Sequence, residues 1–437
     1  MKPLCVVSCP IDTFSGYGAR SRDFVRSLIK EKDSEWDIKI LPQRWGDCPW
    51  NFLSQDDPLR QRFLNGMQQQ PDIWMQITVP NEFQRVGKSF NVGVSAGIET
   101  TIYPAEFIEG SNRMDLNLVS SHHSKNVAQQ TSFEKKDQQG QVIGNVKLER
   151  PIEVLFEGLD LDKYYKKPQK SSILDGINEE FCFLYTGHWL PGAFGESRKN
   201  TATLIKTFLE TFNTPSKKKP ALILKTNHVS YSLLDREEIL KKINQIKSQV
   251  KGNLPNIYLL HGELTDGEMN EINNDPRVKS FVSFTKGEGF GRPLLESAVT
   301  GKPVITTNWS GHIDFIHSDY NVLIGGELKP VHKSAANQFL LKESQWFNIN
   351  IAIAGRAMKD VFNHYKKYQE KSRKQTQYLK NNFSLDKMGE LISKFMPKIE
   401  AAPQMQQLQL PKLKKVGDNE APELPKLKLP KLKKVEA

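Results

Sequence analysis

The chain has few cysteines and no long apolar segment. Its four cysteines, Cys5, Cys9, Cys48 and Cys182, lie among 437 residues and form no Cys-x-x-Cys pair. This pattern excludes a disulfide-stapled secreted scaffold and favours reduced thiols. No apolar run approaches the roughly 20 residues that span a bilayer, and the apolar part of the N-terminus is too short for a secretory signal peptide. We therefore expect a cytoplasmic protein, with peripheral attachment to a membrane as the alternative.

Metal-binding patterns are also scarce. The nine histidines include one adjacent pair, His122-His123, at no spacing typical of a metal site. We therefore predict no catalytic metal and no bound cofactor. The content of hydrophobic residues, 38%, and of charged residues, 25%, is typical of a soluble globular protein. The length allows two domains of ordinary size, each with its own core.

Part of the net charge of +11 is concentrated at the C-terminal end. Residues 401–437 contain eight lysines and four acidic residues, and Leu410-Pro-Lys-Leu-Lys-Lys-Val416 recurs as Leu429-Pro-Lys-Leu-Lys-Lys-Val435. Prolines every few residues forbid a continuous helix, so we predict a disordered basic tail. The tail would bind an anionic surface or a protein partner, or would only keep the chain soluble. The remaining charge favours an anionic acceptor, nucleic acid or a membrane surface, or it balances a negatively charged substrate.

Strand-like and helix-like segments alternate twice along the chain, which is typical of parallel α/β domains. The first series has predicted strands at residues 3–8, 37–41, 73–79, 92–95, 115–120 and 152–155. Its predicted helices cover residues 19–29 and 124–130, and the polar segment 134–148 predicts a hairpin or a mobile loop. The second series has predicted strands at 181–186, 221–225, 256–261, 278–284 and 304–306, and predicted helices at 201–212, 234–250 and within 352–395.

The most informative segment runs from Gly287 to Glu296 and reads Gly-Glu-Gly-Phe-Gly-Arg-Pro-Leu-Leu-Glu. It follows a predicted strand and leads into a helix, because Pro293 is tolerated in a first helical turn, where its missing N–H would have no partner. Glycines before a helix let the backbone approach a ligand and direct free N–H groups at an anion, which suits a diphosphate. Glu288 and Glu296 would repel the diphosphate but would accept hydrogen bonds from sugar hydroxyls. The segment therefore predicts a nucleotide-sugar site.

The segment from Glu288 to Glu296, followed by Gly301-Lys-Pro-Val-Ile305, resembles the Glu-seven-Glu signature of retaining glycosyltransferases with the GT-B fold, the family 4-like "glycosyl transferases group 1". The resemblance implies two Rossmann-like doubly wound domains that face one another across a cleft. The implied boundaries are an N-terminal acceptor-side domain at 1–162, a linker at 163–180, a C-terminal donor-binding domain at 181–382, a terminal helix at 383–400 that crosses back to the first domain, and a disordered tail at 401–437. The tail also resembles those of some phage-encoded proteins.

The resemblance implies that the Glu-seven-Glu segment binds both the sugar and the nucleotide. Glu288 would face the transferred sugar as a catalytic residue, and Glu296 would accept hydrogen bonds from the ribose. The backbone amides of the turn between them would contact the sugar and the phosphates. That turn comprises Gly289, Phe290, Gly291 and Arg292.

Three other segments carry predicted site residues. Arg198 and Lys199 open a predicted helix, and the resemblance implies that Lys199 contacts the donor diphosphate as a compact positive charge. Gly16 and Gly18 follow the first strand, where backbone amides would approach the donor phosphate or the acceptor. Glu99, after another strand, is the candidate for orienting the acceptor hydroxyl, with a buried structural role as the alternative.

The sequence departs from the family pattern after the strand at 181–186. Many relatives carry an arginine after the strand-end glycine, whereas this chain has Gly187-His188-Trp189. His188 would bind the donor as a weaker and pH-dependent cation, or Arg198 would supply the missing charge. Lys225, at the end of another strand, is predicted to be solvated, with a position that reaches the cleft as the alternative.

Together these features predict an enzyme, a retaining hexosyl- or glycosyltransferase. It would move a sugar from a nucleotide-diphosphate sugar to a hydroxyl of a saccharide, a lipid-linked glycan or another glycan; retention is implied by the resemblance alone. One alternative is a binding or assembly protein of the same fold without turnover. Another is a phage-type glycosyltransferase acting on modified DNA, although no basic groove motif with interleaved aromatic residues is present.

Overall fold

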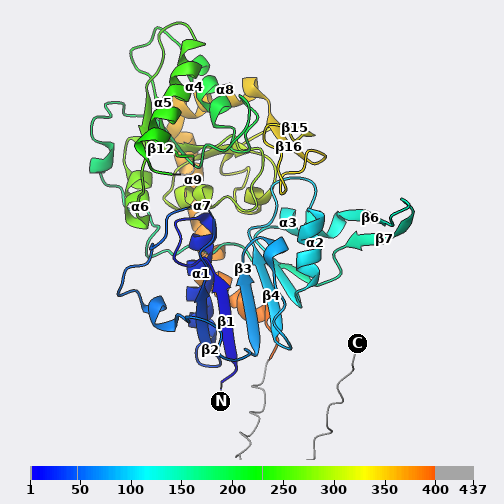
Figure 1. Cartoon of the computed structure of the whole chain (residues 1–437). Helices are drawn as coiled ribbons and strands as arrows, with labels where there is room; N and C mark the ends of the chain where they lie inside the picture. Colours follow the sequence, from blue (N-terminus) through cyan, green and yellow to red (C-terminus); the bar gives the residue numbers. More distant parts are fainter. Residues whose placement is uncertain (1, 47, 229, 399–437) are drawn as a thin grey trace, which may run out of the picture. The chain divides into compact units, whose positions relative to one another are not determined.

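Two six-stranded parallel sheets organise the chain (Figure 1). The computed structural model describes residues 2–46, 48–228 and 230–398. The predicted tail at 401–437 lies outside these residues. Parallel strands need crossover connections, and most successive strands of each sheet are joined through a helix, as the alternating sequence pattern predicts.

The first sheet, which with its helices we call the N-lobe, has the strand order β2-β1-β3-β4-β5-β8. Its strands are β1 (Leu4–Cys9), β2 (Asp37–Pro42), β3 (Ile73–Ile77), β4 (Phe90–Ser95), β5 (Leu116–Val119) and β8 (Ile152–Val154). Its helices are α1 (Gly16–Lys32), α2 (Ala105–Asn112) and α3 (His122–Gln130), with the short 3-10 helices η1 (Pro58–Arg62) and η2 (Pro80–Glu82). The polar segment predicted as a hairpin or a loop is an antiparallel hairpin of β6 (Ser132–Lys136) and β7 (Val142–Lys147), which projects from the sheet (Figure 1).

Helix α1 begins three residues before its predicted start. The Ser15 side chain caps it by accepting a hydrogen bond from the Gly18 backbone N–H at 2.9 Å. Gly16 and Gly18 therefore lie in the first turn of the helix and not in a loop before it.

The second sheet, which with its helices we call the C-lobe, has the strand order β11-β10-β9-β12-β13-β14. Its strands are β9 (Cys182–Thr186), β10 (Ala221–Lys225), β11 (Ile257–Leu260), β12 (Val278–Val282), β13 (Val304–Thr307) and β14 (Val322–Ile324). Its helices are α4 (Thr201–Thr211), α5 (Leu233–Ser248), α6 (Asp266–Asn274), α7 (Arg292–Val299) and α8 (Ile351–Asn363), with the 3-10 helices η3 (Ser172–Leu174) and η4 (Gly311–Asp314). A hairpin of β15 (Gly326–Pro330) and β16 (Gln345–Ile349), which the sequence pattern did not predict, follows β14.

The last two helices connect the cores of the two lobes. Helix α9 (Tyr365–Asn382) contributes Leu379 to the C-lobe core, and helix α10 (Leu385–Phe395) contributes Met388 and Ile392 to the N-lobe core. The Ser27 hydroxyl on α1 donates to the Leu385 carbonyl oxygen at 3.0 Å, which fixes the start of α10 against α1.

Candidate functional site

The predicted site residues lie beside the points at which the strand order of each sheet reverses. In the N-lobe the order reverses between β1 and β3, and Gly16 and Gly18 follow β1. In the C-lobe it reverses between β9 and β12, with His188 after β9 and Glu288 after β12. Ligands of open α/β sheets bind in the crevice beyond the carboxyl ends of the strands at such a switch point.

Four predicted residues form one ion-pair cluster, which we call the Glu99–Glu288 cluster. Lys199 Nζ donates to both carboxylate oxygens of Glu288, at 2.7 and 2.9 Å. Arg198 Nη1 donates to the same carboxylate at 3.3 Å and to the Gly287 carbonyl oxygen at 2.9 Å. Arg198 Nη2 lies 3.4 Å from Glu99 Oε1. Because Glu99 follows β4 and the other residues belong to the C-lobe, the cluster joins the two lobes.

Local backbone geometry presents the two cations of this cluster. Asn200 caps helix α4 with a left-handed φ of 55°, a conformation that asparagine adopts more readily than most residues. Arg198 and Lys199 therefore stand just outside the amino end of α4, where its free N–H groups add to their positive field.

The charge state of Glu288 follows from its partners. Burial raises the pKa of a carboxyl group, but here the adjacent Lys199 and Arg198 outweigh burial and lower the pKa of Glu288 to about 2. Glu288 is therefore ionised at neutral pH. The cluster holds two cations and two carboxylates, so any anion that bound here would have to share Lys199 and Arg198 with Glu288.

The second glutamate of the motif belongs to another ion-pair group, the Asp23–Arg292–Glu296 triad. Arg292 Nε donates to Glu296 Oε1 at 2.8 Å, and Arg292 Nη1 donates to Asp23 Oδ2 at 2.5 Å. Burial raises the pKa of Glu296 to about 7 against the lowering effect of Arg292, and the carboxylates of Asp266 and Asp23 add to the rise. Glu296 therefore titrates near neutral pH. Asp23 lies on α1, so the triad also joins the lobes.

Two glycines of the motif allow the lobes to touch. A Cβ atom on Gly287 would lie 1.9 Å from the Glu99 carbonyl oxygen, and one on Gly289 would lie 2.0 Å from the Ala96 carbonyl oxygen. The Ser120 hydroxyl bridges the same place, 2.6 Å from the Ala96 carbonyl oxygen and 3.1 Å from that of Gly289. The loop after β12 thus packs directly on the end of β4, and water has little room between them.

Gly289→Ala is expected to lower the rate of the predicted sugar transfer at least tenfold. Its Cβ would force the loop after β12 away from Ala96 and displace Glu288 beside it. Gly66→Ala is the matched control, since a Cβ there meets no atom within 4 Å. Steady-state rates of the two purified variants check this expectation. Equal rates for both would show that the close packing at Gly289 has no bearing on turnover.

Solved structures share this fold, although no protein-family model and no curated protein matches the sequence. HepE from Anabaena, in complex with UDP-glucose, is 12% identical with a TM-score of 0.57, over 90% of this chain and 98% of that chain. Sucrose-phosphate synthase from Thermosynechococcus elongatus is 10% identical with a TM-score of 0.56, over 90% and 98%. A glycosyltransferase from Rickettsia africae is 12% identical with a TM-score of 0.56, over 90% and 97%. The chain has the GT-B fold. The predicted α/β fold class is thereby confirmed.

Within the GT-B fold, the remaining parts of the motif have separate surroundings. The Phe290 side chain is buried and its ring centroid lies 4.7 Å from that of Phe315, so only its backbone is available to a ligand. Gly291 caps helix α7 with a φ of 102°, a conformation that favours glycine. No side chain caps this end of α7; Pro293 has no N–H and the Leu294 N–H donates to the Gly291 carbonyl oxygen at 3.0 Å, so the Arg292 N–H is the one that these bonds do not occupy.

His188 and Lys225 line the strand ends next to Lys199. His188 Nδ1 lies 2.9 Å from the His228 carbonyl oxygen. Desolvation of the imidazole lowers the pKa of His188, and the nearby positive charges of Lys199 and Lys225 lower it further. His188 is therefore neutral at pH 7 and acts as a hydrogen-bonding group, not as a replacement cation. The prediction that Lys225 is solvated is wrong, because its Nζ donates to the Gly262 carbonyl oxygen at 2.8 Å and burial lowers its pKa to about 8.

The glycines after β1 differ from one another. A Cβ on Gly18 would lie 2.3 Å from the Thr13 carbonyl oxygen, so the local turn itself requires glycine there. A Cβ on Gly16 would meet no atom within 4 Å, so Gly16 borders open space. Tyr17 between them is held towards β4, where its hydroxyl oxygen accepts a hydrogen bond from the Ala96 N–H at 3.1 Å.

Lys286, which sequence reasoning missed, supports the cluster from behind. Its side chain is 1% exposed, and its Nζ donates to Glu196 Oε2 at 2.9 Å and Asn348 Oδ1 at 2.7 Å. Its Nζ also lies 4.7 Å from the ring centroid of Trp346. Lys286 thus ties the loop before α4 to β16, and its place directly before Gly287 was the only sequence signal for it.

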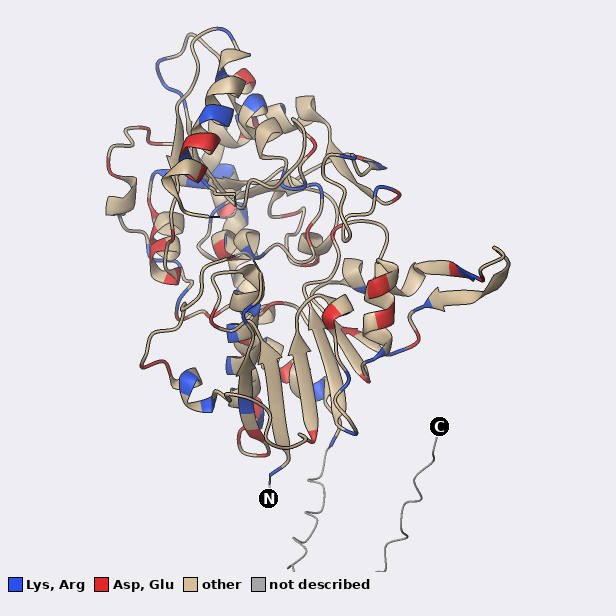
Figure 2. Cartoon of the chain, in the orientation of Figure 1, with Lys and Arg blue, Asp and Glu red and all other residues tan. Residues whose placement is uncertain are grey.

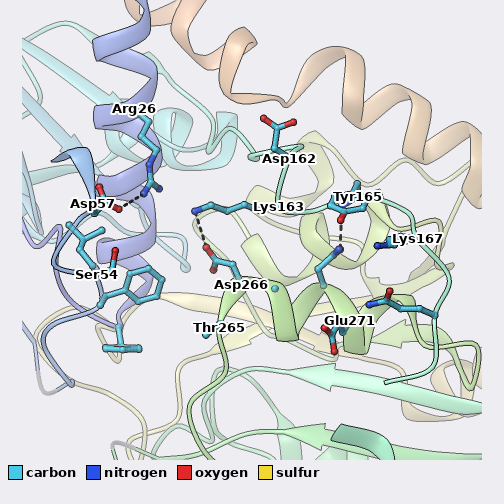
Figure 3. Close-up of a pocket in the computed structure, with 16 residues that line it drawn as sticks. Arg26, Ser54, Asp57, Asp162, Lys163, Tyr165, Lys167, Thr265, Asp266 and Glu271 are labelled. Carbon is cyan, nitrogen blue, oxygen red and sulfur yellow. Dashed lines mark hydrogen bonds and ion pairs between the residues drawn. The ribbon is translucent and has the colours of Figure 1, made fainter. Parts of the chain in front are cut away.

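A cavity of about 630 Å³ has in its lining Asp266, whose carboxylate acts on Glu296 (Figure 3). Its lining comes from α1, the loop before η1, the segment after β8 and the start of α6. Lys163 Nζ, at 3.3 Å, and the Tyr164 hydroxyl, at 3.1 Å, both contact the carboxylate of Asp266 on its rim. None of the four residues of the Glu99–Glu288 cluster lines this cavity.

Asp160-Leu161-Asp162 places two carboxylates two positions apart, a spacing that can hold a divalent cation, so its surroundings matter for the prediction of no catalytic metal. Asp160 accepts a hydrogen bond from the Asp162 backbone N–H at 3.1 Å and lies 3.9 Å from Lys163 Nζ. In the part of the chain that the structure describes, no group of three or more His, Cys, Asp or Glu side chains has an arrangement that could hold a metal ion.

Charged residues of both signs are distributed over both lobes (Figure 2). Helix α1 carries several basic positions, and α6 carries three acidic ones. Among the described residues, no helix is both long and apolar enough to cross a membrane.

Proposed function

We propose that the protein is a retaining glycosyltransferase that moves a sugar from a nucleoside-diphosphate donor to a hydroxyl acceptor, with no cofactor besides the donor. The observation that carries this proposal is the meeting of Glu99, Arg198, Lys199 and Glu288 at the switch point of a GT-B fold. HepE of the same fold is bound to UDP-glucose, which supports a uridine donor as the first to test.

The donor diphosphate would bind where positive groups converge. Lys199 and Arg198 supply charge, and the Arg292 N–H at the amino end of α7 adds a backbone donor. Glu288 would then accept hydrogen bonds from the hydroxyls of the transferred sugar. Glu296 would accept them from the ribose, with the nucleoside end directed towards the cavity of Figure 3.

Transfer breaks the bond between the anomeric carbon and the diphosphate oxygen, and the bonding electrons leave with the diphosphate. Lys199 and Arg198 stabilise the negative charge at the moment it develops. The acceptor hydroxyl, oriented by Glu99, attacks the anomeric carbon from the face that the diphosphate leaves, and its proton passes to a departing phosphate oxygen. This order of events retains the configuration of the sugar. The close packing at Gly287 and Gly289 excludes water and so favours transfer over hydrolysis.

The experiment that tests the proposal uses the purified full chain. UDP-glucose, UDP-N-acetylglucosamine, GDP-mannose and ADP-glucose are supplied in turn, and release of the nucleoside diphosphate is followed with and without simple sugar, glycan or hydroxymethylated DNA acceptors. Release of the nucleotide, with a product whose anomeric configuration by NMR matches the donor, supports the proposal. An inverted product refutes retention. Binding of a donor with neither hydrolysis nor transfer identifies a binding or assembly protein, and transfer to DNA alone identifies the phage-type enzyme.

A further inference from the structure

The Asp23–Arg292–Glu296 triad connects a residue of the N-lobe to the carboxylate assigned to the donor ribose. We infer that Asp23 is a positioning residue: it holds Arg292 on one side so that Glu296 keeps a carboxylate oxygen free for the nucleoside of the donor. This inference rests on the proposed function and extends it, because Asp23 lies on α1, in the lobe opposite to Glu296.

The hydrogen bonds of Arg292 divide its guanidinium between two acids. Nη1 is taken by Asp23 at 2.5 Å and Nε by Glu296 at 2.8 Å, and the three side chains are between 6% and 14% exposed. The N–H groups of Nε and Nη2 point the same way, so a guanidinium free to turn could bind both oxygens of a carboxylate through this pair. Asp23 holds Nη1 and so fixes the orientation of the guanidinium, in which Nε contacts Glu296 Oε1 only. Within the described part of the chain, Glu296 Oε2 accepts no hydrogen bond, so this oxygen remains available to a ligand.

Carboxylates outnumber cations around the triad, which also leaves Glu296 with only a shared positive partner. Four carboxylates, those of Asp23, Glu296, Asp266 and Glu157, act on Arg292, while Arg20 and Arg22 on α1 and the Tyr164 hydroxyl lie near it. Glu296 therefore lacks a cation of its own. Its pKa, raised to about 7, reflects this shared cation as well as its burial.

The test compares Asp23→Asn with the wild-type chain. The affinity for UDP, GDP, ADP and dTDP is measured by calorimetry at pH 8, and the best of the four is followed from pH 5.5 to 8.5. Affinity of the wild type is expected to fall as pH drops through about 7, because protonated Glu296 no longer accepts both ribose hydrogen bonds. The Asp23→Asn variant is expected to bind about tenfold more weakly at pH 8, with the fall displaced to lower pH by at least half a unit, because Arg292 turns onto Glu296.

Two controls separate positioning from a general loss of structure. Asp33→Asn removes a carboxylate just after α1 that pairs with Arg62 at 2.7 Å, about 15 Å further along the helix axis, and should leave nucleotide affinity unchanged. Arg292→Lys should weaken binding by itself, and adding Asp23→Asn to it should change affinity less than twofold. An unshifted pH profile in Asp23→Asn, or an equal loss in both backgrounds, overturns the inference. Failure of the wild type to bind any of the four nucleotides overturns the proposed function and this inference with it.

Discussion

A Glu288→Gln variant is expected to lose about a thousandfold in transfer rate while binding the nucleoside diphosphate more tightly. The Glu288 carboxylate accepts hydrogen bonds from Lys199 and Arg198 at 2.7 to 3.3 Å and is ionised at neutral pH. The amide keeps the shape of the side chain but removes its charge. The transferred sugar then loses an anionic acceptor that is strongest in the transition state, an effect of about 10²–10³ in comparable preorganised sites.

The two readouts of this variant move in opposite directions, which makes the expectation specific. Without Glu288, both cations face the diphosphate with no competing carboxylate beside them, so product affinity should rise about tenfold. Glu210→Gln is the matched control, since Glu210 pairs with Lys206 at 3.9 Å on the exposed face of α4. Calorimetry with UDP and initial rates measure the two effects. Weaker product binding, or a rate within threefold of wild type, would contradict this role of Glu288.

The fold and the central part of the site were predictable because their signals are local. Within ten residues, the Gly287–Glu296 segment indicates the end of a strand, a glycine-rich turn that allows close approach of a ligand, and a helix whose first turn contains Pro293. The Arg198-Lys199 pair before a helix is a similarly local signal. Alternation of strands and helices is a short-range pattern too, so both parallel sheets could be expected from it.

The residues that were not predicted are those whose role depends on partners far away in the sequence. Asp23 is an acid in the middle of an amphipathic helix, and its partner Arg292 lies 269 positions further along the chain. Lys286 meets Glu196 and Asn348, which are 90 and 62 positions away. Lys225 was misjudged because a lysine at the end of a strand is solvated unless another strand end covers it, as Gly262 does here. No periodicity in the sequence records these long-range pairs.

The glycines show how the same residue can satisfy two demands. Sequence reasoning assigned Gly289 to the approach of a ligand. The structure adds that a Cβ on Gly289 would lie 2.0 Å from the Ala96 carbonyl oxygen of the other lobe, so there is no space for a side chain. The motif therefore encodes contact between the lobes as well as the proposed nucleotide-sugar site, and the two are linked because the glycine next to Glu288 is the one that touches the N-lobe.

A Lys199→Met variant is expected to lose both transfer and stability. Lys199 Nζ makes the shortest contacts to Glu288, at 2.7 and 2.9 Å, and the two side chains are 13% and 7% exposed. Methionine has a similar length but no charge, so Glu288 keeps only Arg198 as a partner. Removing one member of a buried pair in this way costs about 3–5 kcal/mol, which urea unfolding measures as a lower midpoint with an unchanged slope.

The functional loss should exceed what the stability loss explains. The diphosphate loses its nearest cation, so the rate is expected to fall about 10²–10³-fold under conditions in which the variant is still folded. Lys206→Met, on the exposed face of the same helix, should change the free energy of unfolding by less than about 0.5 kcal/mol and leave the rate as it is. The double variant Lys199→Met/Glu288→Gln removes the carboxylate that Lys199→Met leaves with one cation, and should recover much of the stability but none of the transfer. A double variant that is no slower than Glu288→Gln alone would show that Lys199 serves only to neutralise Glu288 and does not act on the diphosphate.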